Sequence, residues 1–126
     1  MMDENQLSRV VVDAALEVHR TLGPGLLESV YRQALCHELS LRDVPHCSER
    51  SLKAVYKGLQ LDAAYRMDVL VGDRVVLELK AVEMLLPVHS AQLLSYLRLT
   101  GCKLGLLINF NVPRLRDGIR RVVNGL

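Results

Sequence analysis

The feature that most constrains the fold of this chain is a change in the spacing of its apolar residues. Across residues 52–81 they recur at every second position, and turn residues interrupt the pattern at Gly58 and at Gly72-Asp73. Such alternation is typical of strands with one buried face. It predicts three antiparallel strands joined by two hairpin turns. The alternating positions are Leu52, Ala54, Tyr56, Leu59, Leu61, Ala63, Tyr65, Met67, Val69, Val71, Val75, Leu77, Leu79 and Ala81.

Helical spacing precedes these strands. Residues 7–22 and 27–39 carry apolar side chains three and four positions apart, and the turn Gly23-Pro24-Gly25 separates them. This pattern predicts a helical hairpin, in which Asp3 or Asn5 caps the first helix. The second helix should end before the strands begin.

The last third of the chain predicts two more helices around a buried strand. A helix is expected over residues 89–100, and residues 104–110 form a continuous apolar run, typical of a strand buried on both faces. Pro113 then begins a last helix, whose inward residues are Leu115, Ile119, Val122 and Leu126. The predicted order is ααβββαβα, an α/β domain with one mixed sheet.

Length and charge bound the class of protein. A chain of 126 residues suits a single domain spanning residues 1–126. Its formal charge of +2 is too small to indicate nucleic-acid binding by itself. The acidic, polar first residues do not resemble a signal peptide, and no apolar run reaches the ~20 residues of a membrane helix. We therefore expect a cytoplasmic protein with no membrane partner.

Charged residues interrupt two of the predicted strands at positions flanked by apolar residues. Alternation places Glu78 and Lys80 on one face of their strand, opposite Leu77 and Leu79, and Asp68 lies on the neighbouring strand. Ion pairs on a solvated face would explain this pattern. A divalent cation would also explain it, because burying two carboxylates without a cation is very costly.

The register of the hairpin decides whether the carboxylates can meet. A two-residue turn at Gly72-Asp73 would direct Asp68 and Glu78 to opposite faces of the sheet. A three-residue loop over 72–74 places Val71 opposite Val75 and Asp68 opposite Glu78, and it pairs apolar residues with apolar residues. We predict this second register. Its other pairs are Val69 with Leu77 and Met67 with Leu79.

Several motifs together resemble a known family. In chain order they are Gly25-Leu26-Leu27-Glu28-Ser29-Val30-Tyr31, Tyr56-Lys57-Gly58, Tyr65-Arg66-Met67-Asp68, Glu78-Leu79-Lys80-Ala81-Val82-Glu83, His89-Ser90-Ala91-Gln92-Leu93-Leu94-Ser95-Tyr96-Leu97 and Gly105-Leu106-Leu107-Ile108-Asn109-Phe110. The pattern resembles the GxxExxY family of the PD-(D/E)XK nuclease superfamily over nearly the whole chain, although Met67 stands where the superfamily name has proline. The resemblance implies a PD-(D/E)XK nuclease-like core.

The resemblance also implies the members of a site. It implies that Asp68 and Glu78, with the Leu79 carbonyl, bind Mg²⁺, with Mn²⁺ as the alternative ion. The expected catalytic residues are Lys80, Glu28 and Gln92, and the expected substrate-lining residues are Tyr31 and Tyr96. Glu28 also lies in the first turn of its helix, where the helix dipole alone favours a carboxylate. His89 is expected to cap its helix or lie at the surface, and Glu83 to lie in a solvated loop.

The expected function is Mg²⁺-dependent hydrolysis of phosphodiesters in nucleic acid, with DNA favoured over RNA. The alternative is a nuclease-fold binding or regulatory module that works through a partner without cleavage. A chain this short lacks a separate recognition domain, so we expect a homodimer. The scarcity of aromatic residues does not indicate a stacking platform for single strands. Arginines of the predicted last helix form either a basic strip for phosphates or a solvated face: Arg114, Arg116, Arg120 and Arg121.

Overall fold

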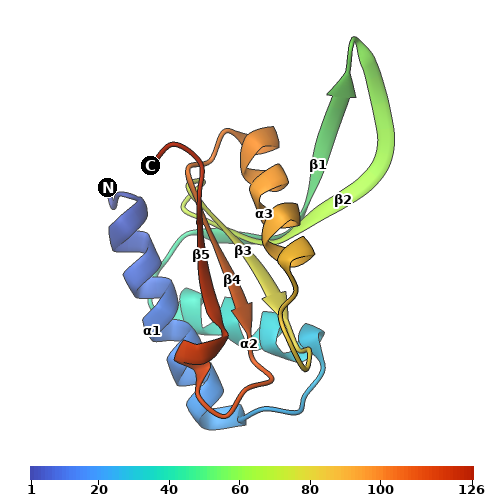
Figure 1. Cartoon of the computed structure of the whole chain (residues 1–126). Helices are drawn as coiled ribbons and strands as arrows, with labels where there is room; N and C mark the ends of the chain where they lie inside the picture. The colour runs from blue at the N-terminus through green and yellow to red at the C-terminus, as the bar shows by residue number, and fades with distance from the viewer.

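The fold is one mixed sheet between two layers of helices (Figure 1). The computed structural model describes residues 1–61 and 65–126, so Ala63 lies outside the described residues. Within them the sheet has five strands in chain order, with β3 and β4 parallel and the other neighbours antiparallel. The α/β class and the mixed sheet are therefore confirmed. The elements are α1 (Glu4–Leu22), α2 (Glu28–Leu41), β1 (His46–Tyr56), β2 (Leu59–Val71), β3 (Val75–Lys80), α3 (Pro87–Thr100), β4 (Leu104–Asn109), a 3₁₀ turn η1 (Leu115–Gly118) and β5 (Ile119–Val123).

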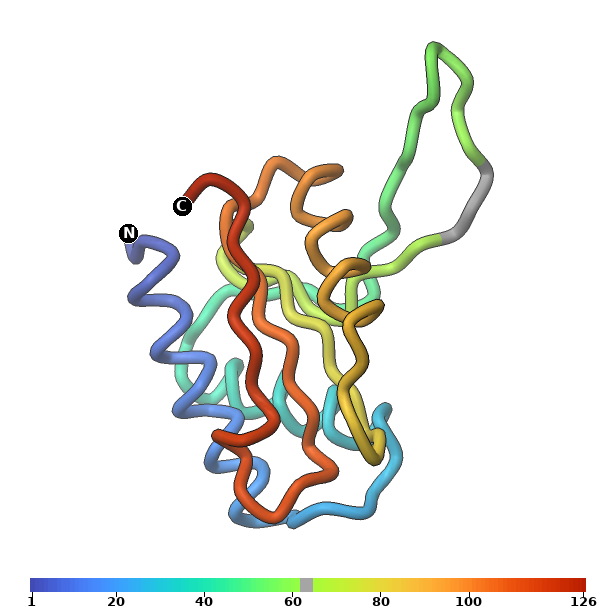
Figure 2. The backbone as a smooth tube through the Cα atoms, viewed as in Figure 1, coloured from blue at the N-terminus to red at the C-terminus, as the bar shows by residue number. Residues whose placement is uncertain are grey.

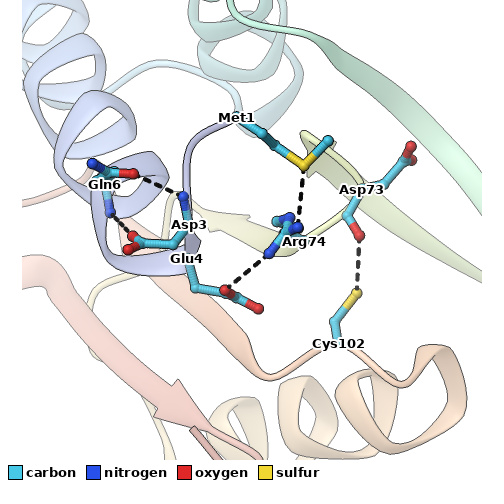
Figure 3. Close-up of polar contacts among 7 residues, drawn as sticks. All are labelled: Met1, Asp3, Glu4, Gln6, Asp73, Arg74 and Cys102. Carbon is cyan, nitrogen blue, oxygen red and sulfur yellow. Dashed lines mark hydrogen bonds and ion pairs between the residues drawn. The ribbon is translucent and has the colours of Figure 1, made fainter.

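The first helix is capped as its sequence predicts. Asp3 accepts a hydrogen bond from the Gln6 N–H at 2.8 Å, and the Gln6 side chain accepts one from the Asp3 N–H at 2.9 Å (Figure 3). Next to this cap, Glu4 pairs with Arg74 of the β2–β3 loop at 3.4 Å. The start of α1 is thus tied to the loop that sets the register of the hairpin.

Two hydrophobic cores lie on opposite faces of the sheet. The larger core joins α1 and α2 to the sheet and includes Leu77 and Leu79 of β3. The smaller core joins α3 to the other face and includes Val76. The alternation of β3 is confirmed, and Glu78 and Lys80 share the α3 side of the strand. Among the described residues, no helix is both long enough and apolar enough to span a membrane.

The predicted hairpin register is confirmed between β2 and β3. Val71 pairs with Val75, and residues 72–74 form the loop, in which Gly72 and Asp73 both have positive φ angles of 57° and 56°. The pairing continues to Val69 and Leu77 and ends there. Because side chains alternate between the two faces of a strand, this register keeps the paired apolar residues of β2 and β3 on one buried face of the sheet.

The ladder does not include the predicted backbone pairs of Asp68 with Glu78 and of Met67 with Leu79. Met67 belongs to the core under α3, whereas Leu79 belongs to the core under α1 and α2. The ladder ends because the Leu79 N–H donates to the side chain of Asp68, at 2.7 Å, instead of to a β2 carbonyl. On the other side of β2, Glu49 has a positive φ of 54°, and it interrupts the pairing of β1 at the same level. β2 and β3 therefore separate at Asp68.

The predicted last helix is also wrong. After a short 3₁₀ turn, Ile119–Val123 forms β5, antiparallel to β4. Because β4 is buried throughout, its second edge needs a partner for its backbone N–H and C=O groups, and β-branched residues suit that strand. Gly118 permits the entry, since a Cβ there would lie 2.2 Å from the Asn109 carbonyl oxygen. The arginines therefore form no helical strip: Arg120 bonds to nearby carbonyls and Arg121 to Asn5.

The far ends of β1 and β2 leave the body of the protein as an arm (Figures 1 and 2). We define the arm as residues 53–61. Its side chains Val55, Tyr56 and Leu59 are 66%, 58% and 62% exposed. β1 begins at His46, six residues before the first alternating position, because its first half pairs with the inner half of β2.

Candidate functional site

The carboxylates of Asp68 and Glu78 meet where β2 and β3 separate. The Leu79 N–H donates to Asp68 Oδ2 at 2.7 Å, and the Asp68 N–H donates to Glu78 Oε1 at 3.5 Å. Each side chain thus reaches the backbone of the other strand. Glu78 is only 4% exposed, and Asp68 is half-buried. The structure therefore brings together the two residues that sequence reasoning assigned to a metal.

Burial dominates the electrostatics of this pair. Burial and then the charge of Asp68 raise the pKa of Glu78 to about 8, although Lys80 and the Asp68 N–H act in the opposite direction. Burial also raises the pKa of Asp68, and the hydrogen bond from Leu79 and the charge of Lys80 oppose it. Two carboxylates held together away from water favour either a bound proton or a bound cation.

Glu28 and Lys80 complete the group of charges. Glu28 is the first residue of α2, and burial, followed by repulsion from Asp68, raises the pKa of its carboxyl. The charge of Lys80 opposes this rise in the pKa of Glu28, and it opposes the rise for Asp68 and Glu78 in the same way. The start of α2 therefore lies beside the end of β3. We call Glu28, Asp68, Glu78 and Lys80 the carboxylate site.

Tyr31 does not line a substrate surface. Its side chain is fully buried, and its ring stacks on Phe110 with a centroid distance of 4.6 Å. Its hydroxyl donates to the Gly23 carbonyl at 2.6 Å and accepts from the Leu26 N–H at 3.2 Å. The expected role was wrong because Tyr31 lies on the apolar stripe of α2, which faces the core. Tyr31 instead fixes the loop that leads into Glu28.

The helix α3 contributes Tyr96 and Gln92. Tyr96 is 5% exposed, and burial, then Glu78 and Asp68, raise the pKa of its hydroxyl. Gln92 is half-buried and lines a groove of about 450 Å³ beside Tyr96. In residues 1–61 and 65–126 no hydrogen bond joins Gln92 to a carboxylate, so its catalytic role stays a proposal. His89 accepts the Leu86 N–H through Nδ1 at 3.0 Å and thus caps α3, and Glu83 is exposed.

Sequence reasoning missed Arg32. The charge of its guanidinium opposes the rise in the pKa of Glu28 and of Asp68. The guanidinium also pairs with Glu49 at 2.7 Å. Arg32 follows Glu28 by four residues on α2, so the spacing of neighbours on one helix face was the signal that would have found it. A second cation therefore lies beside the carboxylate site.

Asn109 is a second residue that sequence reasoning missed. It is 2% exposed, and its side chain accepts from the Val82 N–H at 3.1 Å and donates to the Val82 carbonyl at 2.9 Å. These two bonds hold the chain that follows Lys80. A polar residue at the end of a buried strand was the signal, because a buried amide needs partners.

The donor set fits a hard divalent cation. No group of three or more His, Cys, Asp or Glu side chains within the described part of the chain is arranged to hold a metal. Mg²⁺ does not need one, because it is usually held by one or two carboxylates, with water and substrate phosphates completing its coordination. Asp68 and Glu78 supply such a pair, and burial raises the pKa of both carboxyls although Lys80 acts in the opposite direction.

Comparison with known proteins identifies a family. The family model for the PD-(D/E)XK nuclease superfamily matches residues 5–122. No match was found among curated proteins or among solved structures. The matched range includes every residue of the carboxylate site.

Proposed function

Because the chain belongs to the PD-(D/E)XK nuclease superfamily, we propose that it hydrolyses phosphodiester bonds in nucleic acid with the help of Mg²⁺. Nucleases of this superfamily generally use divalent metal ions. The observation that carries the proposal is the meeting of Asp68 with Glu78, which is only 4% exposed, beside Lys80. Such a concentration of negative charge favours a bound cation, because Lys80 offsets the charge only in part and the pKa of Glu78 stays raised.

Each residue of the carboxylate site has a role in this proposal. Asp68 and Glu78, with the Leu79 carbonyl, would hold the metal. When bound, the metal would lower the pKa of a water molecule and neutralise charge on the phosphate. Lys80 orients the attacking water or stabilises the negative charge that develops on the phosphate oxygens. Glu28, at the start of α2, would be an additional metal ligand or would support the other ligands.

The proposal extends to substrate and assembly. DNA is the favoured substrate over RNA, and Mn²⁺ is the alternative ion. A homodimer would supply the reach that a domain of this size lacks. The setting that we propose is the cytoplasm, where the thiols of its three cysteines remain free.

The test is a cleavage assay with labelled DNA and RNA, each single-stranded and duplex, in Mg²⁺, in Mn²⁺ and in EDTA. Wild type should cut in metal, and Asp68→Ala and Glu78→Ala should abolish cleavage. Lys80→Ala should reduce it by about 10²-fold or more, the scale of losing a transition-state donor. Lys103→Ala is the matched control, because Lys103 is exposed and precedes β4 at the opposite end of the sheet from Lys80.

Two outcomes contradict the proposal. Cleavage that survives unchanged in Glu78→Ala would show that the activity arises elsewhere. Binding of nucleic acid without cleavage in any metal would favour the alternative, a nuclease-fold binding module.

A further inference from the structure

A groove runs between α3 and the base of the arm, beside the carboxylate site. It has a volume of about 450 Å³, and its lining includes Tyr65, Val88, His89, Gln92, Tyr96 and Leu99. The lining is aromatic and aliphatic, with a few polar groups among the apolar ones. We call it the α3 groove.

We propose that the α3 groove receives one unpaired nucleobase of the substrate strand. The preferred substrate is then nucleic acid that is single-stranded, or locally unpaired, at the cleaved phosphate. This inference rests on the proposed function, since it places the base beside the residues that act on the phosphate.

The first argument is the chemistry of the walls. Tyr65 is 43% exposed, and its ring lies 6.2 Å from that of Tyr96 at a tilt of 57°. Val88 and Leu99 are 63% and 45% exposed. Such a set of exposed apolar and aromatic side chains marks a binding surface. A nucleobase suits it, because a base stacks on an aromatic ring through a face that every base possesses.

The second argument is the position of the groove next to the carboxylate site. Tyr96 packs in the same core as Met67, which precedes Asp68, and burial, then Glu78 and Asp68, raise the pKa of the Tyr96 hydroxyl. A base in the groove therefore lies beside the residues that we propose act on the phosphate. A base that is stacked and paired inside a duplex cannot enter such a groove.

The third argument is the placement of positive charge. Arg66 follows Tyr65, and its side chain is 62% exposed. Arg66 and Arg32 both pair with Glu49, at 3.9 and 2.7 Å, and Lys80 belongs to the carboxylate site. These three cations thus gather beside the carboxylate site, where they can contact the phosphates next to one bound base.

The polar groups of the groove suit the edge of a base. The Nδ1 atom of His89 accepts the Leu86 N–H, so a neutral ring carries its proton on Nε2, which is then a donor. Gln92 offers both a donor and an acceptor from the same helix turn. The scarcity of aromatic residues in the sequence did not indicate a stacking platform for single strands. Two tyrosines brought together by the fold are enough for one base.

The experiment measures the binding of a fluorescein-labelled DNA strand by fluorescence anisotropy, alone or annealed to its complement, in Mg²⁺ and at fixed ionic strength. All variants are made in a Lys80→Ala background, in which cleavage is slow. Tyr65→Ala should weaken single-strand binding about ten-fold, in the range for losing one base–aromatic stack. Tyr65→Phe keeps the ring and should bind normally. Tyr56→Ala removes an exposed tyrosine of the arm that does not line the groove, and it is the matched control.

The inference is supported if the single strand binds at least about ten times more tightly than the duplex and if only Tyr65→Ala reduces this preference. It is overturned if the duplex binds as tightly, if Tyr65→Ala behaves like Tyr56→Ala, or if no strand binds. Cleavage by the wild type separates the two proposals. Single-strand binding through Tyr65 without any cleavage refutes hydrolysis alone, and cleavage of duplex without dependence on Tyr65 refutes the groove alone.

Discussion

The buried carboxyl of Glu78 should make the stability of the metal-free protein fall as pH rises. Its pKa in the folded protein is about 8, against an ordinary value of 4.5. Between these values the folded protein holds a proton that the unfolded chain has released, so stability decreases with increasing pH. The contribution is complete below the ordinary pKa and is lost as pH passes through about 8.

The magnitude follows from the size of that difference. At 1.36 kcal/mol for each pH unit, raising the pKa from 4.5 to about 8 corresponds to at most roughly 5 kcal/mol. Between about pH 6 and about pH 9, the expected loss is roughly 2–3 kcal/mol. The variant Glu78→Gln has no charge to bury and keeps an oxygen for the Asp68 N–H, so it should lose much less.

The measurement is urea unfolding followed by circular dichroism in EDTA across this pH range. Cysteines and other titrating groups are the same in all variants, so their contribution to the pH dependence of stability cancels when the variants are compared. Glu83→Gln is the matched control, because Glu83 is exposed and its removal should leave the slope of the wild type unchanged. The reasoning is refuted if the stability of the wild type does not change with pH or if Glu78→Gln shows the same slope.

Four further outcomes are expected. Adding Mg²⁺ near pH 8 should stabilise the wild type against urea and leave Glu78→Gln unchanged, because a ligand that binds only the folded site stabilises it. Tyr31→Phe should cost roughly 1–3 kcal/mol in the same unfolding experiment, because the Gly23 carbonyl and a backbone N–H lose a buried partner. Gly118→Ala should cost about 1–3 kcal/mol, since its Cβ meets the Asn109 carbonyl oxygen at 2.2 Å. Glu28→Gln should reduce cleavage while changing stability by less than ~1 kcal/mol; unchanged cleavage would make Glu28 only a charge at a helix end.

Local rules of chain geometry account for the parts of the fold that the sequence predicted. The capping box at Asp3 and the end of α1 at Gly23 depend on neighbours within one helix. The register at Val71 and Val75 depends on a short loop and on the two-residue period of a strand. These rules involve few residues, so the sequence determines them almost alone.

The last element shows where such rules fail. Leu115, Ile119 and Val122 fit a helical stripe, yet Ile119–Val123 is a strand. The edge of the buried β4 has backbone N–H and C=O groups that need partners. The segment with β-branched residues pairs with this edge as a strand. A pattern of apolar residues in a short segment does not contain this information.

The carboxylate site was also predicted in part by the sequence and decided in part by the tertiary structure. Alternation and motif order pointed to Asp68, Glu78 and Lys80, because a charge between two buried residues is conspicuous in sequence. Only the tertiary structure decided that Asp68 replaces a strand partner by accepting the Leu79 N–H, and that Glu78 is only 4% exposed.

The tyrosines were decided by the tertiary structure. The family resemblance implied similar roles for Tyr31 and Tyr96, but Tyr31 faces the core that α2 forms with the sheet, whereas Tyr96 lies beside the carboxylates. The sequence by itself determined which residue types are available, where the first three helices lie and how β2 and β3 are in register. Packing of α2 and α3 on opposite faces of one sheet decided which side chains share a site, because burial and distance depend on elements far apart in the chain.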